Sequence, residues 1–442
     1  MRIAVVVTSF PSLSQTFVLG QITGLIDRGH EVDIYAAASE PDVGGAEHAV
    51  VKEYGLVKRT RYQPARATDG SWLRRMAATV YVLARYWWRD PVNAWRVMKG
   101  PPASFGHASR LSLLSAGAPF AGRGSYDAVL CHFGPNGRRI ARLRESGLVR
   151  GKIATVFHGY DMSRYLITNG QRSYERLFAT GDLFLPVSDF WRQRLISLGC
   201  PPERIAVHHM GISLSKFPLW PRRVAHEDAT VRLLTVARLV EKKGVEYAIR
   251  AVAALRESTD RRVEYRILGD GPLRARLEGL VRELGVGDTV KLVGESDQAG
   301  VRTAMRRSDV FVAPSVVAED GDMEGVPVSI MEAMACGLPV VSTLHSGIPE
   351  LVRDRTTGYL VPERDAASLA RALVRLVDEP RLRRKLGMAG RGVVERGYDL
   401  DKLNDRLVEL LAEMGTAAAR HQRATGPRLV AGAHGRTAGP AF

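Results

Sequence analysis

The sequence predicts an α/β protein of two domains, each built around a parallel sheet of the Rossmann-like type. The first observation is a strand, helix and strand pattern at residues 2–10, 17–29 and 31–38, which is typical of a βαβ unit. The second is that the same alternation returns, after a polar stretch, from residue 232 onward. The third is length, because 442 residues exceed one ordinary core and suggest two domains of about 200 residues each.

Composition limits the class of protein further. Apolar residues make up 45% of the chain, as in a folded globular protein. The three cysteines are widely spaced and odd in number, so they favour a reducing cytoplasm over a disulfide framework or a metal site. No apolar run approaches the roughly 20 residues that cross a bilayer, and the segment MRIAVVVTSF lacks the features of a signal peptide. We therefore expect a cytoplasmic protein that is soluble or peripheral to a membrane.

The charge of the chain is strongly positive, at +16, and arginine carries most of it. Such a charge suits nucleic acid, an anionic membrane surface or phosphorylated substrates, and it also suits a general bias toward arginine codons. The sequence has no helix-turn-helix, RNP or zinc-finger pattern, so we expect no nucleic-acid partner.

Residues 11–16 form a polar turn between the first strand and the first helix. The turn is not G-x-G-x-x-G, so it does not indicate a dinucleotide-binding fold. Its hydroxyl residues Ser12, Ser14 and Thr16 suit helix capping as well as contact with a ligand.

Residues 56–110 interrupt the alternation. Four of the six tryptophans lie between residues 72 and 99, where basic residues outnumber acidic ones. Apolar residues recur there at helical spacing, namely Leu73, Met76, Ala77, Val80, Leu83, Ala84 and Trp87. Arginines fall largely on another face, namely Arg74, Arg75, Arg85 and Arg89. Two interpretations stay open: a helix that lies on an anionic membrane, and an amphipathic helix whose apolar face packs on the core.

The rest of the first half predicts four more strands, at residues 127–133, 152–158, 183–188 and 204–212. His158 ends the second of them and begins the segment His-Gly-Tyr-Asp161, at the sheet edge where parallel sheets bind ligands. A single histidine is often structural, but this position makes His158 a candidate functional residue. His132, His208 and His209 have weaker cases.

The second half follows a polar linker at residues 213–230. Its expected strands are 232–239, 265–269, 290–294, 309–315, 339–343 and 358–362, and its expected helices are 244–257, 273–285, 298–307 and 366–378. A last helical region at 396–414 is followed by a basic tail, 415–442, rich in Ala and Gly, which is expected to be disordered. The expected domains are therefore residues 1–212 and 231–395.

The most informative stretch is AEDGDMEGVPVSIMEAMACGLP at residues 318–339. An acidic loop leads into a short helix, with Pro327 suited to its first turn and Gly337 to its C′ position. The free N–H groups and the positive dipole end of such a helix start suit a phosphate. Glu324 lies before the helix and Glu332 inside it, so the two can reach different parts of one elongated ligand. A solvated acidic loop before an ordinary amphipathic helix is the alternative.

Two cations of the second half have a related position. Arg238 ends the first strand, and Lys243 lies in the turn before the next helix. Two fixed cations beside a helix start are what a diphosphate requires. The turn Gly269-Asp270-Gly271-Pro272 lies beside the expected cleft and suits either a plain turn or a ligand loop.

Taken in this order, the motifs resemble those of family 4 retaining glycosyltransferases with the GT-B fold, in which two Rossmann-like domains face a cleft. The matching segments are FHGYD with His158, VARL with Arg238, EKKG with Lys243, GDGP, and the E-x7-E pair of Glu324 and Glu332. More narrowly, SFPSLSQTFV, HFGPNG, EDGDMEGVPVSIMEAMACG and STLHSGIPELV are similar to transferases of exopolysaccharide and capsule biosynthesis of the colanic-acid and amylovoran type. Where many family members carry a Gly-Gly pair in the first loop, this chain has Pro11-Ser12-Leu13-Ser14.

The resemblance implies a nucleotide diphosphate sugar as the donor, bound mainly by the second domain. Its catalytic residues would be His158, Arg238, Lys243 and Glu324. The donor-binding set would consist of Arg238, Lys243, Gly271, Gly294, Glu324, Gly325, Val326, Pro327 and Glu332. In this set Arg238 and Lys243 hold the diphosphate, Glu324 holds sugar hydroxyls and Glu332 bonds the ribose diol. No enzymic nucleophile is assigned.

The resemblance also implies a lipid-linked or oligosaccharide acceptor, with Ser14, Thr16 and Asp161 on the acceptor side. The protein would be peripheral at the inner face of the cell membrane, with residues 72–99 on the anionic surface, and helix 396–414 would pack back toward the first domain. No cofactor or metal is expected, and Asp320-Gly321-Asp322 is interpreted as a loop although it looks like a metal-binding D-x-D motif.

Two other functional classes stay open. One is a different GT-B activity, such as an epimerase or a phosphorylase, although no cofactor lysine for a phosphorylase stands out. The other is a non-catalytic scaffold that binds membrane or polysaccharide. Intact Arg238, Lys243, Glu324 and Glu332 argue against the scaffold.

Overall fold

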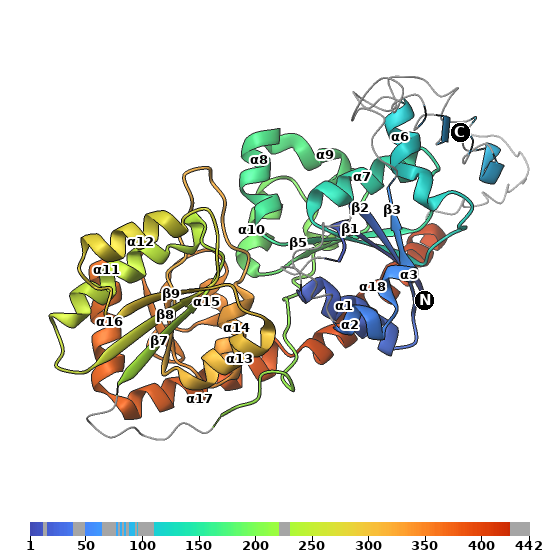
Figure 1. Cartoon of the computed structure of the whole chain (residues 1–442). Coiled ribbons are helices and arrows are strands. Elements are labelled where there is room, and N and C mark those ends of the chain that lie inside the picture. Colours follow the sequence, from blue (N-terminus) through green and yellow to red (C-terminus); the bar gives the residue numbers. More distant parts are fainter. Residues whose placement is uncertain are drawn as a thin grey trace, which may run out of the picture.

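The structure is a computed structural model that describes residues 1–11, 16–38, 49–63, 110–220 and 230–424, together with residues 77, 80–81, 84, 88–92 and 95. Of residues 49, 110–112 and 415–424 it describes the backbone alone. Two six-stranded sheets form two lobes, one on each side of Figure 1. All pairs of neighbouring strands run parallel. The predicted α/β class with two parallel-sheet domains is thereby confirmed.

The N-terminal sheet has the strand order β3-β2-β1-β4-β5-β6. Its strands are β1 (Arg2–Ser9), β2 (Glu31–Ala38), β3 (Thr60–Tyr62), β4 (Ala128–His132), β5 (Lys152–Phe157) and β6 (Leu183–Pro186). Its helices are α1 (Thr16–Asp27), α2 (Ala49–Glu53), α3 (Leu56–Arg59), α6 (Arg110–Gly117), α7 (Gly134–Glu145), α8 (Arg164–Asn169), α9 (Glu175–Thr180) and α10 (Asp189–Ser197). The central strands are continuous apolar runs, as expected for a sheet that helices cover on both faces.

The C-terminal sheet has the strand order β12-β11-β10-β7-β8-β9. Its strands are β7 (Val231–Val236), β8 (Val263–Leu268), β9 (Val290–Gly294), β10 (Val310–Ala313), β11 (Val340–Thr343) and β12 (Gly358–Val361). Its helices are α11 (Val245–Arg256), α12 (Arg274–Glu283), α13 (Gln298–Arg307), α14 (Val328–Ala335), α15 (Ile348–Leu351), α16 (Ala366–Asp378) and α17 (Pro380–Gly397). In both sheets the order reverses beside the first strand, and such switch points bind ligands at the carboxyl ends of the strands.

Two details of the N-terminal sheet differ from the prediction. The expected strand at 204–212 is not formed; Ala206 and His208 each donate one N–H to β6, and single bridges occur at Ile205 and Ile212. This segment is extended because it leaves the sheet toward the second domain. Conversely, β3 was not predicted, since three residues are too few to show a periodic pattern.

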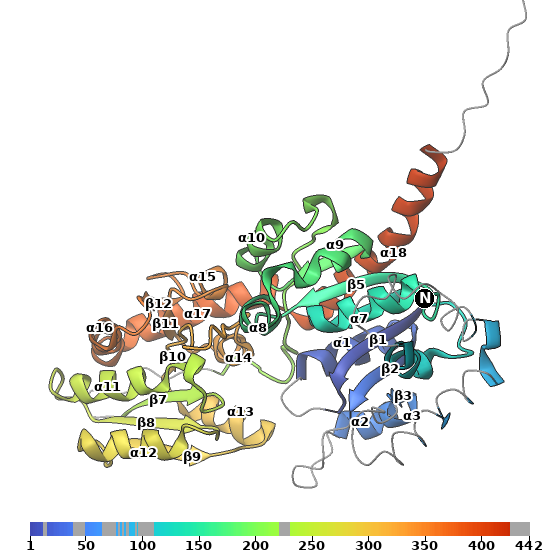
Figure 2. The same ribbon diagram turned by 90° about the horizontal axis from the view of Figure 1, so that it is seen from above.

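The chain crosses between the domains twice, at neighbouring places. Ile212, on the way out, donates its N–H to Tyr398 and accepts one from Leu400, on the way back. After the second crossing, α18 (Leu400–Ala424) packs against α1 and runs along the N-terminal domain, as Figure 2 shows from above. The buried side chain of Asn404 donates to the carbonyl of Gly20 in this contact. Residues 415–424 are therefore helical, contrary to the expected disorder from 415, and residues 425–442 lie outside the described part.

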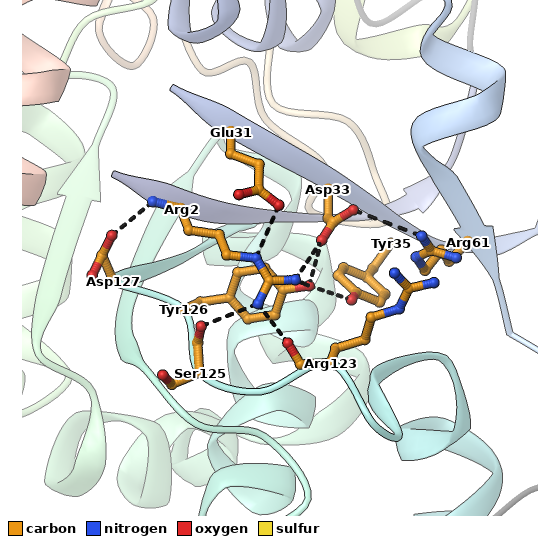
Figure 3. A network of polar contacts seen from close by, with 9 residues as sticks. All are labelled: Arg2, Glu31, Asp33, Tyr35, Arg61, Arg123, Ser125, Tyr126 and Asp127. Atoms are coloured by element: carbon orange, nitrogen blue, oxygen red, sulfur yellow. Dashed lines mark hydrogen bonds and ion pairs between the residues drawn. The ribbon is translucent and has the colours of Figure 1, made fainter. Parts of the chain in front are cut away.

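A polar network closes the amino-terminal ends of β1, β2 and β4 (Figure 3). The Arg2 guanidinium contacts Glu31 at 3.1 Å and Asp33 at 3.2 Å. It also lies 4.4 Å from the ring centre of Tyr126, whose hydroxyl donates to Asp33 at 2.7 Å. The backbone N–H of Arg2 donates to Asp127 at 2.7 Å. The charged groups at this edge of the sheet thus bind one another.

Candidate active site

The two domains touch where the loop after β5 meets the loop before α14. The approach is so close that a Cβ atom on Gly159 would lie 2.7 Å from the backbone nitrogen of Gly325. A Cβ atom on Gly325 would lie 2.0 Å from the carbonyl oxygen of His158, so neither position accepts a side chain without movement. The backbone N–H of Met323 also donates to the hydroxyl of Ser163 at 3.3 Å. The His-Gly-Tyr-Asp segment and the acidic loop, far apart in sequence, are therefore neighbours.

Two lysines before α11 pair with carboxylates of the acidic loop. The ammonium of Lys243 lies 2.9 Å from Glu324, and that of Lys242 lies 2.9 Å from Asp322. Burial alone would raise the pKa of Glu324, but the two ammonium groups outweigh it and hold that pKa below its ordinary value. Glu324 is consequently an anion whose side chain is 8% exposed. The structure thus brings together Lys243 and Glu324, which the sequence separates by some 80 residues.

Arg238 lies just beyond β7, on the same edge of the sheet. Its side chain is exposed and makes no hydrogen bond or ion pair with any residue that the structure describes. This guanidinium is therefore open to a ligand. A cation on the same edge of the sheet as the paired Lys243 suits a ligand with more than one negative charge.

Helix α14 (Val328–Ala335) begins directly after the acidic loop; its C-terminal end is as expected, whereas Pro327 lies just before the first turn in which it was expected. Pro327 occupies the N-cap, and Gly337, past the end, has a φ of 75° as the predicted C′ position requires. Gly325, Val326 and Pro327 are all buried. The amide groups at the start of α14 therefore lie beside the Lys243–Glu324 pair, with the positive end of the helix dipole directed to the cleft.

Glu332 lies one turn into α14, and the pKa of its carboxyl group is shifted upward. The residue is half-buried, and removal from water raises its pKa to about 8, with the Arg302 guanidinium as a smaller opposing influence. No described residue accepts or donates a hydrogen bond to its carboxyl group. It lines a cavity of about 350 Å³ together with Thr16, Phe17 and Gln298. A carboxyl group that lacks a protein partner and faces a cavity suits a ligand with hydroxyl groups.

His158 faces the acidic loop from the N-terminal domain. Its ring lies between those of Phe17 and Phe133, with centre distances of 4.8 and 4.5 Å. Its Nε2 atom lies 3.2 Å from Nδ1 of His132, whereas its Nδ1 atom is buried without a partner among the described residues. Burial, and the neighbouring His132, lower the pKa of His158 well below its ordinary value. The imidazole is therefore neutral and can act as a hydrogen-bonding group, with a limited capacity to hold a proton.

Two further histidines lie behind His158. Burial lowers the pKa of His132 to about 3 and that of His208 to about 4, so both rings are neutral. The amide nitrogen of Gln21 lies 3.3 Å from Nε2 of His208. One nitrogen of each ring and the Gln21 amide oxygen lack a partner in the described structure. The carboxyl-terminal edge of this sheet therefore contains several unsatisfied polar atoms.

Asp161 has a different position from the one that an acceptor contact requires. It is fully buried, and its carboxylate accepts N–H groups from Gly134, His158 and Gly159, each at 2.9 Å. Burial raises its pKa to about 6 in spite of these bonds. The carboxylate thus holds the turn at His158 in place, and an acceptor contact for Asp161 stays a prediction that this geometry does not favour.

The remaining predicted residues lie in two places: Thr16 lines the cavity beside Glu332, whereas Gly271 and Gly294 follow strands of the second sheet. Thr16 is the first residue of α1, and Ser14 lies outside the described residues. Gly271 and Gly294 lie at the carboxyl ends of β8 and β9, where Gly269 donates its N–H to the Gly294 carbonyl at 2.7 Å. These turns place backbone atoms of both strands near each other at the edge that faces the cleft.

The Asp320-Gly321-Asp322 segment is engaged by basic side chains. Asp320 lies 3.0 Å from the guanidinium of Arg164 in the other domain, and Asp322 pairs with Lys242. In the described part of the chain, no three His, Cys, Asp or Glu side chains are grouped as metal ligands would be. Each of the two carboxylates is thus paired with a cation of the protein.

Several site residues were missed by sequence reasoning because they lie one step behind the cleft. His345 and Ser346 follow β11 and bond the backbone of Glu324, and Glu363 follows β12 and contacts His345. Glu350 accepts the N–H groups of Asp189 and Phe190 at the start of α10, across the domain boundary. The available signal was their place directly after buried strands, which the segment STLHSGIPELV shares with the other site loops.

Comparisons with known proteins agree with this arrangement. Residues 14–216 match the family described as Glycosyltransferase Family 4, and residues 217–393 match the one described as Glycosyl transferases group 1. The chain is 40% identical to the putative colanic acid biosynthesis glycosyltransferase WcaL of Escherichia coli over 93% of this chain and 99% of that protein. It is 37% identical to the amylovoran biosynthesis glycosyltransferase AmsK of Erwinia amylovora over 94% of this chain and 100% of that protein.

Solved structures share the fold at low sequence identity. Anabaena Alr3699/HepE in complex with UDP and glucose aligns with a TM-score of 0.66 and 16% identity over 93% of this chain and 100% of that one. Sucrose-phosphate synthase from Thermosynechococcus elongatus aligns with a TM-score of 0.67 and 19% identity over 94% of this chain and 100% of that one. Both likenesses establish the two-domain fold.

Proposed function

The chain belongs to the glycosyltransferase family of the colanic acid and amylovoran biosynthesis enzymes, and from this premise we propose that it transfers a sugar from a nucleotide diphosphate sugar to a lipid-linked saccharide. The product would belong to an exopolysaccharide or another cell-surface glycan. One observation carries the proposal: the Lys243–Glu324 pair lies before the start of α14, in the loop that touches the turn at His158, and Arg238 follows the first strand of the same sheet. Cations, amides and a carboxylate are what a sugar diphosphate needs.

In this proposal the diphosphate binds to Arg238, Lys243 and the amides at the start of α14. Charge develops on the diphosphate as the sugar leaves, and fixed donors aimed at developing charge lower the barrier. Loss of one such donor costs about a hundredfold to a thousandfold in turnover. Lys243 is well placed for the task because the carboxylate of Glu324 already holds it at 2.9 Å. Arg238 can bind phosphate without first breaking an ion pair with another described residue.

The sugar and the nucleoside occupy the two sides of the diphosphate. Glu324 accepts hydrogen bonds from sugar hydroxyls, and Glu332, whose carboxyl group has no hydrogen-bond partner among the described residues, bonds the ribose diol. The turns at Gly271 and Gly294 flank the base. His158 meets the sugar from the opposite domain as a neutral hydrogen-bonding group, which agrees with the direction of its pKa shift. The site is therefore complete only when the two domains face each other across the cleft.

The reaction in this proposal retains the anomeric configuration and uses no enzymic nucleophile. The acceptor hydroxyl attacks the face from which the diphosphate departs, and the diphosphate oxygens take up its proton. Among the described residues, the carboxylates closest to the sugar position, Glu324 and Asp161, are occupied by Lys243 and by backbone amides. These contacts support a binding role for Glu324, and they do not favour either carboxylate as a covalent nucleophile.

We further propose that transfer requires no metal ion. The carboxylates that could hold one, Asp320 and Asp322, are paired with Arg164 and Lys242. Two cations, Arg238 and Lys243, are available for the charge that a metal would otherwise neutralise. Activity should persist in excess EDTA. Complete loss of activity, restored by Mg²⁺ or Mn²⁺, would contradict this part of the proposal.

The acceptor side of the proposal includes an anionic membrane surface at residues 72–99. Several apolar side chains of this stretch are described, and they are exposed: Val80, Tyr81, Trp88, Val92 and Trp95 are 53% to 89% exposed. Ala77, Val80 and Ala84 of the predicted apolar stripe are exposed too. At these positions the stripe does not pack on the core, which supports the membrane interpretation over the alternative. The other members of the stripe, Leu73, Met76, Leu83 and Trp87, lie outside the described residues, as do Arg74, Arg75 and Arg85 of the other face.

A panel of nucleotide sugars tests the proposed function. UDP-, GDP- and ADP-sugars are each added to the purified protein, and thermal unfolding and slow hydrolysis are measured. A donor at 100 times its Kd should stabilise the fold by about 2.7 kcal/mol. Lys243→Ala is the matched control, which should lose both the stabilisation and the hydrolysis. No response of the folded wild-type protein to any member of the panel would contradict the proposal.

A further inference from the structure

His345 lies behind the acidic loop and contacts the backbone of Glu324, whereas Lys243 forms its ion pair with the Glu324 carboxylate. It follows β11, and its side chain is fully buried. Its Nε2 atom lies 3.0 Å from the backbone nitrogen of Glu324, and its Nδ1 atom lies 2.6 Å from a carboxylate oxygen of Glu363. The second oxygen of Glu363 accepts the backbone N–H of Val317 at 2.8 Å. An imidazole thus bridges a carboxylate anchored to one loop and the backbone of the residue that pairs with Lys243.

These two contacts determine where the proton of His345 is. The backbone nitrogen of Glu324 can only donate, so Nε2 must present a lone pair. The proton of the neutral ring is therefore on Nδ1, from which it is donated to Glu363. Nε2 thus accepts from the backbone of Glu324 while Nδ1 donates to Glu363, and both ring nitrogens are bonded.

The neighbouring Ser346 holds the other side of the same peptide. Its hydroxyl lies 2.6 Å from the carbonyl oxygen of Glu324 and 2.9 Å from that of Gly325. Ser346 has a φ of 50°, a conformation that non-glycine residues rarely adopt. Both backbone polar groups of Glu324 are therefore bonded to consecutive residues of one loop, while its carboxylate contacts Lys243. The position of that carboxylate depends on this double contact.

We propose that His345 is a positioning residue for glycosyl transfer, which fixes the Glu324 loop through the hydrogen bond from Glu324 N–H to Nε2. The inference rests on the proposed function, because it assumes that Glu324 holds the donor sugar. A misplacement of about 1 Å in a catalytic contact can lower the rate about a hundredfold. The alternative is a histidine that fills space and satisfies a buried amide without effect on the reaction.

Two conservative variants separate these roles. His345→Asn places an amide where Nδ1 was, so it keeps the contact with Glu363 and loses the acceptor for Glu324. His345→Gln reaches the position of Nε2 with its carbonyl oxygen, so it keeps the acceptor and loses the contact with Glu363. We expect kcat/KM for hydrolysis of the best donor of the panel to fall about thirtyfold in His345→Asn and about threefold in His345→Gln. The matched control is His30→Asn. His30 precedes β2 in the N-terminal domain and contacts the amino group of Met1, so this variant should leave kcat/KM unchanged.

Amide hydrogen exchange provides a second measurement that needs no substrate. In the protein without ligand, exchange at Glu324 should be at least about tenfold faster in His345→Asn than in wild type, and close to wild type in His345→Gln. If His345→Asn does not fold, Ser346→Gly tests the same peptide from its carbonyl side and removes the unusual φ. Ser346→Gly should also lower kcat/KM, by a smaller factor than His345→Asn.

The outcomes are distinct. Equal activity of the Asn and Gln variants, or faster exchange at Glu324 with unchanged kcat/KM, would overturn the positioning role. Unchanged exchange in His345→Asn would overturn the hydrogen bond itself. A wild-type protein that hydrolyses no member of the panel contradicts the proposed function, whereas the exchange experiment still decides the hydrogen bond.

Discussion

Both ends of the N-terminal sheet carry polar residues, but the hydrogen bonding of these residues differs between the two ends. At the amino-terminal end, Arg2, Asp33 and Tyr126 contact one another, as Figure 3 shows. Burial raises the pKa of Tyr126 far above its ordinary value, so its hydroxyl keeps the proton that it donates to Asp33. Tyr35 lies 2.6 Å from the same hydroxyl and stacks on Phe120 at 3.8 Å. The Asp33 carboxylate and the Tyr126 hydroxyl are thus fully engaged, although Nε of Arg61 and Nε2 of His30 are buried without a partner among the described residues.

At the carboxyl-terminal end of the same strands, His132, His158 and His208 are as deeply buried but incompletely bonded. Each ring has one nitrogen without a partner in the described part of the chain. An unsatisfied buried polar group costs about 1 to 3 kcal/mol, so this edge contributes less to stability than it would if it were apolar or fully bonded. It is also the edge that faces the second domain.

The difference indicates that stability and binding are divided between the two ends. Parallel strands gather their carboxyl ends on one edge, and loops there can be shaped for a ligand without loss of the sheet. Polar groups left open on that edge await a ligand or water, whereas those at the opposite edge complete a closed network. We expect substitutions at the two ends to separate into effects on activity and effects on stability.

The largest effect is expected on turnover, in the loops of the second domain that meet the open edge. Lys243→Ala or Glu324→Ala should lower turnover by at least about a hundredfold, because each removes a contact to the reacting group. Both residues lie in loops, so the variants should remain folded, which circular dichroism and thermal unfolding check. A folded variant with near-normal transfer would rule out this site.

A matched pair in the same loop sharpens the result. Lys242 and Asp322 are also 2.9 Å apart and similarly shielded, at 16% exposure for both side chains. Lys242→Ala removes a cation of equal charge that is not assigned to the diphosphate. A loss of turnover below about tenfold is expected, through the weaker field at Glu324. Equal losses in Lys242→Ala and Lys243→Ala would reduce the role of Lys243 to net charge.

The opposite edge should respond in stability. Asp33→Ala leaves the Arg2 guanidinium and the Tyr126 hydroxyl without their shared acceptor, and we expect a loss of about 2 to 4 kcal/mol in urea unfolding. Glu31→Ala removes another partner of Arg2, but the Glu31 side chain is 64% exposed, so about 1 kcal/mol or less is expected. Activity per folded molecule should stay within about twofold of wild type in both. A large loss of turnover in folded Asp33→Ala would break the division between the two ends.

Much of this division could be foreseen from the sequence. Buried runs such as residues 2–10 and the turn at Gly337 determine strands and a helix end locally, so they were predicted correctly. Lys243 and Glu324 were assigned to one donor site by the family resemblance, and each lies before a helix. Position relative to a strand end is readable from the chain alone.

What could not be foreseen depends on contacts between distant segments. His345 is ordinary in sequence, and only the fold brings it within 3.0 Å of Glu324. The segment 204–212 has the composition of a strand, but it has to leave the sheet, so tertiary context overrides its propensity. Asp161 has the right neighbours for a ligand contact, yet three backbone N–H groups occupy it. Local patterns do not contain this information.

A smaller effect, on the pH dependence of the free energy of unfolding, is expected at Glu332 of α14. Its folded-state pKa of about 8 lies above the ordinary value of 4.5, so the folded protein binds the proton more tightly than the unfolded chain. The stability of the wild type should therefore decrease as pH rises from about 4.5 to 8. Glu332→Gln lacks this titration, and its gain over wild type should grow in that window.

The measurement is urea unfolding of wild type and Glu332→Gln at pH 5 and pH 8. The residue is half-buried, so water screens part of the effect and we expect a gain of about 1 kcal/mol at pH 8. Glu409→Gln, which replaces an exposed carboxylate on α18, is the control and should show no such growth. If the Glu332→Gln gain is the same at both pH values, Glu332 is ionised in the folded protein and not held as an open acid.

The smallest effect on the chemistry is expected from the membrane face, away from both edges of the sheet. Each basic residue near an anionic leaflet contributes about 1 kcal/mol, so even four contacts would favour peripheral attachment. Exposed aromatic rings such as Trp88, which is 89% exposed, can add anchoring at headgroup depth. Wild type should sediment with anionic liposomes at low salt and be released at high salt, since salt screens surface charge. Replacement of Arg74, Arg75, Arg85 and Arg89 by Gln should weaken binding while donor hydrolysis stays unchanged. If wild type shows no preference for anionic over neutral liposomes at low salt, the stripe does not dock on a charged membrane, and the acceptor must reach the open edge without it.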